Sequence, residues 1–154
     1  MQFFKVSQNN FSGDINTVKL PRRATVGSAG YDFFAPCDIT FAPGETKKIE
    51  TGVRAKIESG FALFIFPRSG LGFKYRLMLD NTVGVIDSDY YYSDNEGHIM
   101  IKMTNHSDKE LNIKQGEAFA QGVFLQYFLT DDDNADGIRN GGFGSTTKQP
   151  KTQY

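Results

Sequence analysis

The stretch NTVGVIDSDY, residues 81–90, combines residue types that a plain structural strand does not need. Asp87 directly follows the apolar pair Val85 and Ile86, although aspartate is a poor strand residue. A carboxylate at the end of a buried strand is partly desolvated, which suits it to act as a general base. A strand that runs into a polar turn accounts for the same residues equally well, so both interpretations stand at this point.

A second polar group follows the apolar run FALFIF, residues 61–66, and Pro67. Here Arg68, Ser69 and Gly70 would bring a guanidinium, a hydroxyl and an unhindered backbone N–H into one turn, which is a natural anion cradle. An ordinary turn with a solvated arginine is the competing interpretation.

Two more polar residues interrupt apolar segments. Asp32 lies in the alternating run YDFFA, where a turn-capping aspartate is the default interpretation. Gln121 lies in the middle of a gapless apolar segment, and a buried amide needs hydrogen-bond partners. A bond within the core and a bond to a ligand explain Gln121 equally well.

Short strands joined by tight turns would have to position these groups. The 16 glycines, 14 phenylalanines and 7 tyrosines, with few long stretches of helical period, predict an all-β fold. Two strand arms are expected on either side of Asn81 and Thr82, at 75–80 and 83–88. The other expected strands are 3–6, 31–35, 47–57 with a break near Gly52, 61–66, 98–104, 110–113 and 116–128.

The length of 154 residues predicts one domain, residues 1–130, followed by a tail, residues 131–154. The composition changes at Thr130, where the acidic, polar run TDDDNADGIRN begins, and this run is typical of an extended linker. Further on, Gly142 and Gly144 would let a flexible C-terminal arm approach an anion closely.

Composition narrows the choice of partners. A net charge of -1 and a pI near 6.1 argue against nucleic acid and anionic membranes as partners, and no apolar run is long enough to span a bilayer. The single cysteine, Cys37, predicts a buried, inert thiol in a cytoplasmic protein. One cysteine and two histidines are a poor set of zinc ligands, so a metal, if one is used, is expected to be a hard cation such as Mg²⁺.

Five stretches, taken in this order, resemble the motif set of the trimeric dUTP diphosphatase (dUTPase) family. They are AGYDF (29–33), PRSGLG (67–72), GVIDSDY (84–90), GEAFAQ (116–121) and GGFGST (141–146). The resemblance implies a jelly-roll-like β-sandwich or barrel and a homotrimer with three active sites, each built from all three subunits. It also implies hydrolysis of dUTP to dUMP and diphosphate with Mg²⁺.

Carried over residue by residue, the resemblance makes Asp87 the general base that activates water for attack on the α-phosphorus. Asn81 and Gly84 would belong to a close-fitting hairpin that pairs with uracil and excludes the thymine methyl, and Tyr90 would lie under the deoxyribose. Asp32 would orient an arginine and contact Mg²⁺ through water. The remaining implied contacts are phosphate contacts from Arg68, Ser69, Gly70, Gln121, Arg139, Gly144, Ser145 and Thr146, and a uracil stack from Phe143.

The chain departs from the family pattern at four places, one of which is Thr147, where a glycine is common. Ala118 and Phe119 stand where an arginine or a similar residue is usual, and Arg139 lies one residue closer to the glycine pair than is typical. After Tyr90 the sequence YYSDNEG is longer than the usual connection, which predicts a protruding loop at 91–96 that a protein partner would contact.

Two alternatives to a dUTPase remain. A dCTP deaminase of the same fold needs a glutamate at the cytosine amine, whereas the acids in the equivalent hairpin are Asp87 and Asp89. A dUTP-binding regulatory protein would use the 91–96 loop or the C-terminal arm to engage another protein, and such a role does not exclude catalysis.

Overall fold

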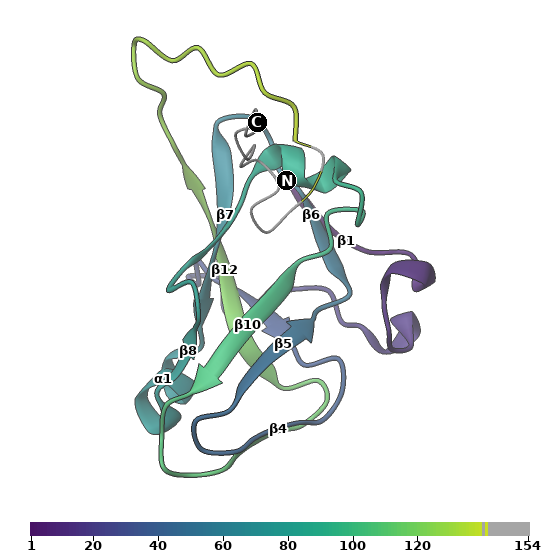
Figure 1. Ribbon diagram of the computed structural model, residues 1–154, viewed down its shortest axis with the longest axis vertical. Helices are drawn as coiled ribbons and strands as arrows, with labels where there is room; N and C mark the ends of the chain where they lie inside the picture. The colour runs from purple at the N-terminus through teal and green to yellow at the C-terminus, as the bar shows by residue number, and fades with distance from the viewer. Residues whose placement is uncertain (140, 142–154) are drawn as a thin grey trace, which may run out of the picture.

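The computed structural model describes residues 1–139 and 141, and its regular structure is almost entirely short β-strands (Figure 1). The helical elements in this part of the chain are α1 (Ser69–Tyr75) and the 3₁₀ turns η1 (Gln8–Asn10), η2 (Ile15–Thr17) and η3 (Ser88–Tyr92). The strands are β1 (Gln2–Lys5), β2 (Arg22–Arg23), β3 (Tyr31–Phe34), β4 (Ile39–Phe41), β5 (Thr46–Glu50), β6 (Val53–Lys56), β7 (Phe61–Pro67), β8 (Leu77–Leu79), β9 (Gly84–Ile86), β10 (Met100–Asn105), β11 (Leu111–Ile113) and β12 (Ala118–Gln126).

The largest sheet in the described part of the chain has the order β2-β3-β12-β7-β9 and is antiparallel throughout. Its centre is the long pairing of β12 with β7, which run side by side in Figure 1. Gly122 lies at this centre, where an added Cβ would lie 2.8 Å from Leu63 and 3.0 Å from Phe33. Glycine therefore lets the inner face of β12 pack closely against the buried side chains of its neighbours.

A second sheet, β5-β10-β8, crosses in front of the first in Figure 1. Because successive side chains of a strand point to opposite faces, alternate residues of both sheets enter one shared core. The pairs β1–β6 and β11–β4 complete the strand pairing of the described residues. The core includes Phe33, Leu63 and Ile65 from the first sheet and Ile49, Ile101 and Met103 from the second. The predicted all-β, jelly-roll-like fold is thus confirmed.

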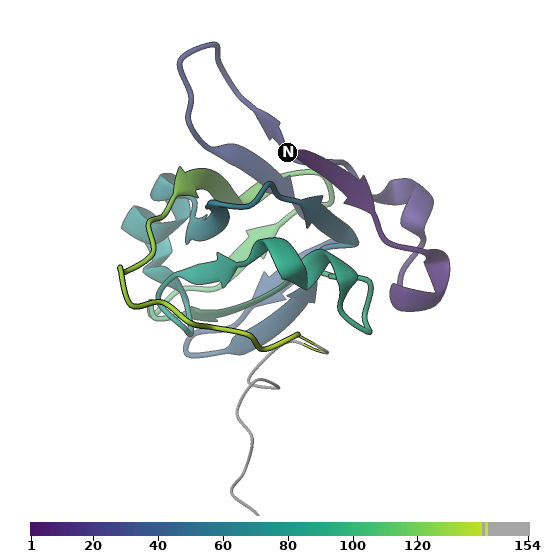
Figure 2. The same ribbon diagram turned by 90° about the horizontal axis from the view of Figure 1, so that it is seen from above.

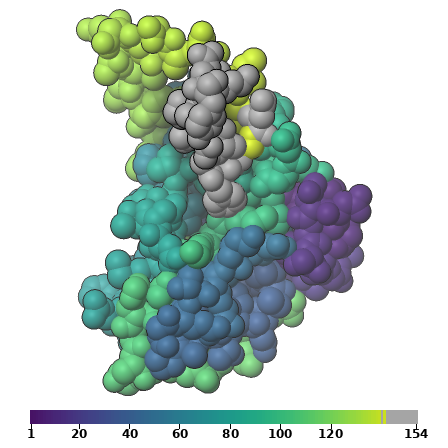
Figure 3. Space-filling view, in the orientation of Figure 1, coloured from purple at the N-terminus to yellow at the C-terminus, as the bar shows by residue number. Residues whose placement is uncertain are grey.

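The segment after β12 leaves the body of the molecule. Residues 127–138 are exposed and contain no strand or helix, and they stand out at the top of the space-filling view (Figure 3). Seen from above, this segment turns back toward η3 (Figure 2). The division into residues 1–130 and 131–154 stays a prediction.

The turn predicted at Arg68 to Gly70 is wrong in its form. The residues from Ser69 onward make the short helix α1, although two of them are glycines, which are poor helix formers. The helix begins with bonds from the Leu71 and Gly72 N–H groups to the Arg68 carbonyl, at 3.1 and 2.9 Å. The helix ends at Arg76, whose left-handed backbone (φ 49°) lets its N–H bond the carbonyls of Leu71 and Gly72.

The hairpin predicted around Asn81 and Thr82 also differs from the structure. The two arms exist as β8 and β9, but β8 pairs with β10 and β9 pairs with β7. The turn between them is held locally by bonds from the Thr82 N–H to the Leu79 carbonyl (3.0 Å) and from the Val83 N–H to the Asn81 carbonyl (2.7 Å). The connection is therefore a tight turn between two sheets.

The expected burial of Cys37 needs correction, and the two histidines differ in their surroundings. Cys37 is exposed, because it lies in the connection between β3 and β4. His98 is fully buried just before β10, whereas His106 is exposed just after it. No helix in the described residues is long and apolar enough to cross a membrane.

Candidate functional site

A cavity of about 580 Å³ opens beside β9, between that strand and the β5-β10-β8 sheet. Its apolar wall includes Ile65, Leu79, Ile99 and Ile101, all of them core residues. Five of the residues singled out in the sequence also line it, namely Asn81, Gly84, Asp87, Tyr90 and Arg139. A volume of this size is in the range of small-ligand sites, and the mixture of apolar walls with a few polar groups is typical of them.

The wall at Gly84 is formed by bare backbone. Gly84 is buried, and an added Cβ would lie 3.2 Å from Ile65 and 3.7 Å from Leu79. The strand β9 is the last one in its sheet, so its outer edge keeps backbone N–H and C=O groups free of sheet pairing. This edge is therefore able to hydrogen-bond a flat polar ligand.

Asp87 follows β9 directly and precedes η3, as the predicted position at a strand end requires. Its carboxylate is not strongly desolvated in a single chain, since 47% of the side chain is exposed. Instead it is paired: Arg139 Nη2 donates to Asp87 Oδ2 at 2.5 Å and Arg139 Nε donates to Asp89 Oδ1 at 2.8 Å. One guanidinium thus bridges both acids of the IDSD sequence.

Tyr90 presents its ring to the cavity and keeps its hydroxyl in the protein. The residue is only 6% exposed, and burial raises the pKa of its phenol. Its hydroxyl donates to the His98 carbonyl at 2.8 Å and accepts a bond from Asn95 Nδ2 at 2.9 Å. The ring is therefore an uncharged wall with a fixed position.

Asp32, Gln121 and Arg68 form a second group. Asp32 on β3 lies opposite Gln121 on β12, and Gln121 lies opposite Phe66 on β7. The side chains of Asp32, Gln121 and Phe66 therefore share one face of the sheet. Arg68 Nη1 donates to Asp32 Oδ1, and Gln121 Nε2 donates to the Pro67 carbonyl at 3.2 Å. The buried carboxylate of Asp32 thus has a cationic partner, as burial of a charge demands.

Glycines in the neighbouring backbone leave space around Gln121 and Arg68. An added Cβ at Gly30 would lie 2.5 Å from Gln121 Oε1, so glycine leaves the space that the amide occupies. Ser69 and Gly70 are exposed at the start of α1, and nothing lies within 4 Å of a Cβ placed at Gly70. Backbone and side-chain donors are thus open to an anion beside Arg68.

The cavity residues and the group of Asp32, Gln121 and Arg68 lie on different faces of the five-stranded sheet. Gly122 turns its Cα toward the core, so its neighbour Gln121 points outward, whereas Gly84 and Ile65 line the cavity on the core side. The cavity lining contains neither Arg68 nor Gln121. Within one chain, Arg68 and Gln121 therefore do not share this cavity with Asp87. The predicted contacts Phe143, Gly144, Ser145 and Thr146 lie outside the described residues.

The loop 91–96 does not protrude as predicted. The Arg54 guanidinium stacks on the Tyr91 ring at 3.7 Å, and Arg54 Nη2 donates to the Tyr91 carbonyl at 2.6 Å. Glu96 accepts a bond from the Ser7 N–H at 2.8 Å, so the loop is held against the N-terminal segment. Only part of the loop faces solvent, notably Tyr92, which is 73% exposed.

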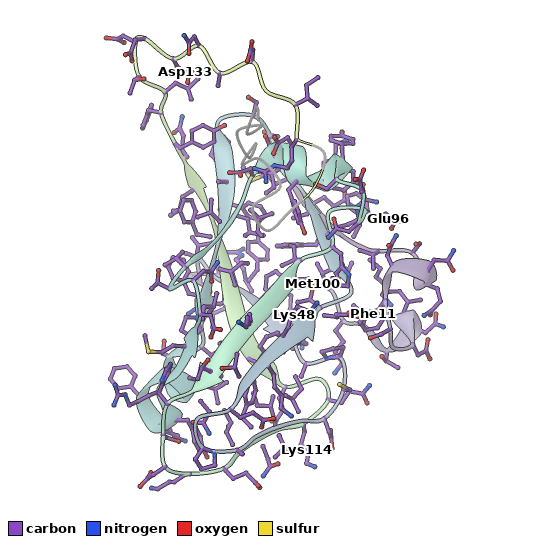
Figure 4. All side chains as sticks on the ribbon, viewed as in Figure 1. Phe11, Lys48, Glu96, Met100, Lys114 and Asp133 are labelled. Atoms are coloured by element: carbon purple, nitrogen blue, oxygen red, sulfur yellow. The ribbon has the colours of Figure 1, made fainter. Side chains whose placement is uncertain are left out.

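Sequence reasoning missed several residues at the cavity. Lys48 and Lys102 lie opposite each other on β5 and β10 and line the cavity; Figure 4 labels Lys48 beside Met100. Alternation in KKIE and IKM marks them as side chains that point away from the core, but it gives no signal that they lie next to β9. Lys102 is paired with Asp80 at 3.0 Å.

The fold is all-β and jelly-roll-like, and the cavity has an exposed backbone edge and an acid at its rim. These features describe a β-fold protein with a site for a small polar ligand. Solved structures of dUTPases share this fold. A dUTPase from Streptococcus mutans has a TM-score of 0.73 to this chain at 36% identity, covering 85% of this chain and 99% of that one. A dUTPase from phage phi11 of S. aureus, with a species-specific insert, has a TM-score of 0.68 at 20% identity, covering 89% and 96%, and shares the fold.

Sequence relatives narrow the class further. The dUTPase family model matches residues 16–147. A deoxyuridine 5′-triphosphate nucleotidohydrolase from Lactococcus lactis subsp. lactis is 46% identical over 132 residues, which cover 84% of this chain and 88% of the relative. One from Desulfitobacterium hafniense is 42% identical over 136 residues, which cover 83% and 87%. This chain belongs to the dUTPase family.

Proposed function

We propose that this chain is a dUTP diphosphatase, which hydrolyses dUTP to dUMP and diphosphate. The observation that carries the proposal is the joint placement of Gly84, Asp87 and Tyr90 around one cavity, together with membership of the dUTPase family. Each of these residues has a separate task that its surroundings support.

Base recognition falls to the edge of β9. Successive N–H and C=O groups of an edge strand offer donors and acceptors that match the carbonyls and the N3–H of uracil. Cytosine presents the opposite pattern at two of these positions, so it would leave polar groups unpaired. The close packing of Gly84 against Ile65 leaves little freedom for the backbone to move aside for a C5 methyl. Asn81, in the adjoining turn, supplies a polar side chain to the same cavity.

The sugar is selected by shape. The Tyr90 ring lies in the cavity wall, and it would lie against C2′ of a deoxyribose. A ribose 2′-hydroxyl would meet the ring without finding a hydrogen-bond partner, because the phenol hydroxyl is already bonded inside the protein.

Asp87 acts as the general base. Its carboxylate takes a proton from a water molecule as the water oxygen attacks the α-phosphorus and the bond to the bridging oxygen of the diphosphate breaks. In the described structure Asp87 Oδ2 is bonded to Arg139 of the same chain. We propose that Arg139 leaves Asp87 when residues 131–154 extend to a neighbouring copy, which frees this oxygen for water.

Neighbouring copies of the chain complete the site. Arg68, Ser69, Gly70 and Gln121 would hold the phosphates, and none of them lines the cavity of its own chain. A homotrimer places the outer face of one sheet beside the β9 cavity of the next copy, and residues 131–154 of a third copy would bring Phe143, Gly144, Ser145 and Thr146 to the substrate.

Mg²⁺ fits this arrangement when the triphosphate supplies its ligands. Among the described residues no group of three or more His, Cys, Asp or Glu side chains is placed to hold a metal ion. Asp32 Oδ1 accepts a bond from Arg68, and we propose that Oδ2 contacts a water of the cation. When bound, Mg²⁺ neutralises phosphate charge and helps to hold the triphosphate in its reactive geometry.

A second candidate role is regulatory protein binding through the 91–96 loop. The exposed Tyr92 favours it, because an aromatic side chain on a braced loop is a typical anchor for a partner. This role is compatible with catalysis. A deaminase is disfavoured, since the acids at the cavity rim are aspartates. A cytoplasmic location stays a prediction from composition.

The direct test is an incubation of the purified chain with each dNTP and with UTP in the presence of Mg²⁺, followed by assay for diphosphate. We expect diphosphate from dUTP and little from the other nucleotides. Release of ammonia from dCTP, or hydrolysis of all nucleotides at similar rates, would contradict the proposal.

A further inference from the structure

We infer that Asn95, in the loop after η3, is a positioning residue for sugar selection: it fixes the Tyr90 ring in the wall of the cavity. This inference rests on the proposed function. Its basis is the pair of bonds at the phenol hydroxyl, which accepts from Asn95 Nδ2 at 2.9 Å and donates to the His98 carbonyl at 2.8 Å. The two bonds hold the far end of the ring from the loop side.

Asn95 is itself held in place. Its Oδ1 accepts a bond from the Gly97 N–H at 3.2 Å, and its carbonyl accepts one from the His98 N–H at 3.1 Å. The side-chain amide therefore uses its oxygen to close the turn and its nitrogen to reach Tyr90. An amide is the group that can accept and donate in this way, whereas a carboxylate has no proton for the phenol oxygen.

The turn also packs directly on the backbone of Tyr90. Gly97 has a positive φ of 68°, and an added Cβ would lie 2.6 Å from the Tyr90 carbonyl oxygen and 2.7 Å from Tyr91 Cα. Only glycine fits this close approach. The residues that make the connection longer than usual are thus folded against the residue that we assign to sugar selection.

The loop is fixed to the body of the protein at both sides. On one side, the buried His98 ring accepts a bond at Nε2 from the Gly52 N–H, at 2.9 Å. On the other, Glu96 bonds the Ser7 N–H, and Figure 4 labels Glu96 on the loop above Phe11 of the N-terminal segment. The loop is therefore a brace for the ring.

Removal of the Asn95 amide leaves the phenol with one of its two bonds. A less firmly held ring can withdraw from the cavity when a ribose 2′-hydroxyl presses on it. The binding of UTP should therefore improve more than the binding of dUTP. Because one neutral hydrogen bond is at stake, we expect the preference for dUTP over UTP to fall by about 3- to 10-fold. The change should come mainly from a lower KM for UTP, with kcat on dUTP nearly kept.

The test compares Asn95→Ala with Asp94→Ala, its exposed neighbour in the same loop. The measurements are kcat and KM on dUTP and UTP, with the melting temperature of each variant. We expect the dUTP preference to fall in Asn95→Ala and to stay unchanged in Asp94→Ala. A lower melting temperature with an unchanged preference would overturn the inference, because a purely structural asparagine would act on both substrates alike.

A second variant, Tyr90→Phe, keeps the ring and removes the hydroxyl. It removes both bonds of the phenol, so its effect should be at least as large as that of Asn95→Ala. The double variant should be no worse than Tyr90→Phe alone, because the bond from Asn95 is already lost in that variant. Additive effects would overturn the inference. A wild-type chain that fails to hydrolyse dUTP would instead overturn the proposed function, so the two failures are distinguishable.

Discussion

Asp87 shares the Arg139 guanidinium with Asp89, so two acids of similar exposure compete for one cation at the cavity rim. Of these two acids only Asp87 lines the cavity, and this distinguishes the proposed base from its neighbour. The Asp87→Asn variant keeps the shape of the side chain and cannot take a proton. We expect turnover to fall by roughly 10² to 10⁴-fold, with dUTP affinity changed only slightly. Steady-state kinetics and calorimetric binding of dUTP measure the two quantities.

The matched control is Asp89→Asn, which removes the same charge two residues away. Because Asp89 does not line the cavity, its variant should retain turnover to within a few-fold. If Asp87→Asn weakens dUTP binding as much as it slows turnover, the side chain holds the substrate, and its assignment as the base is wrong.

The sequence drew attention to single residues where an apolar pattern surrounds a polar group. Asp87, Gly84 and Tyr90 line one cavity, and the sequence could group them because they are close together in the chain. Asn95 could not, because nothing in SDNEG indicates that the amide reaches back to the Tyr90 hydroxyl. The pairing of Arg139 with Asp87 was equally hidden, since the two residues are 52 positions apart and the connecting segment has no regular structure.

At the scale of elements, strand positions were predictable and strand partners were not. Alternation along KKIE and HIMIKMT predicts strands because it reports burial of one face. It does not say that β8 pairs with β10 and β9 with β7, since the partner depends on how the two sheets pack. The sequence likewise predicted a turn at Asn81 and Thr82, but it could not show that this turn connects strands of two different sheets.

The buried His98 ties the start of β10 to the turn at Gly52, and this junction should be sensitive to pH. Burial lowers the pKa of His98 below its ordinary value of 6.5, and the ring accepts a bond at Nε2, as a neutral imidazole must. The unfolded chain therefore binds a proton below about pH 6.5 that the folded chain does not. Stability is complete above this pH and falls as the pH drops toward the lower folded pKa.

We expect the melting temperature to fall by several degrees between about pH 7.5 and about pH 5.5, measured by circular dichroism. The lowered pKa values of Glu50 and Glu96 act in the same direction, but only at a lower pH, below their ordinary value of 4.5. His98→Gln should flatten the slope between pH 7.5 and 5.5, whereas a variant of the exposed His106, His106→Gln, should keep it. A wild-type slope in His98→Gln would refute the assignment.

The segment from residue 139 onward holds Arg139 and the predicted contacts to uracil and the γ-phosphate. A chain that lacks residues 139–154 should still fold, because the described core ends with β12. Its kcat/KM on dUTP should fall by at least about tenfold, since water is no longer excluded from the site. A shorter deletion, 148–154, removes none of the predicted contacts and should keep the wild-type rate. Full activity of the longer deletion would dismiss the arm as a closing element.

At the scale of the whole molecule, the two groups of predicted residues lie on opposite faces of one sheet. Asp87 and Gly84 are at the cavity on the core side, and Arg68 and Gln121 are on the outer side. A motif in a sequence states which residues act together but carries no information on whether they belong to one chain. If they do act together, the phosphate group of one copy must meet the cavity of another.

Complementation between two inactive variants tests this sharing. Arg68→Ala removes the proposed phosphate contact and Asp87→Asn removes the proposed base, so a homotrimer of either variant should be inactive alone. In a mixed trimer, some sites combine Arg68 from the Asp87→Asn chain with Asp87 from the Arg68→Ala chain, and these sites contain both groups. In each mixed trimer one of the three sites combines the two intact residues, so trimers that contain both variants should have about a third of the wild-type rate.

The mixture is prepared by co-expression with two different affinity tags and purified through both, so that only mixed oligomers are assayed. Each variant carried alone through the same tags provides the background. Recovered activity requires that Asp87 and Arg68 of one site come from different chains, because no single chain in the mixture has both. Mixed oligomers that stay at background would place both residues of a site in one chain, and the outer face of the five-stranded sheet would then need another role.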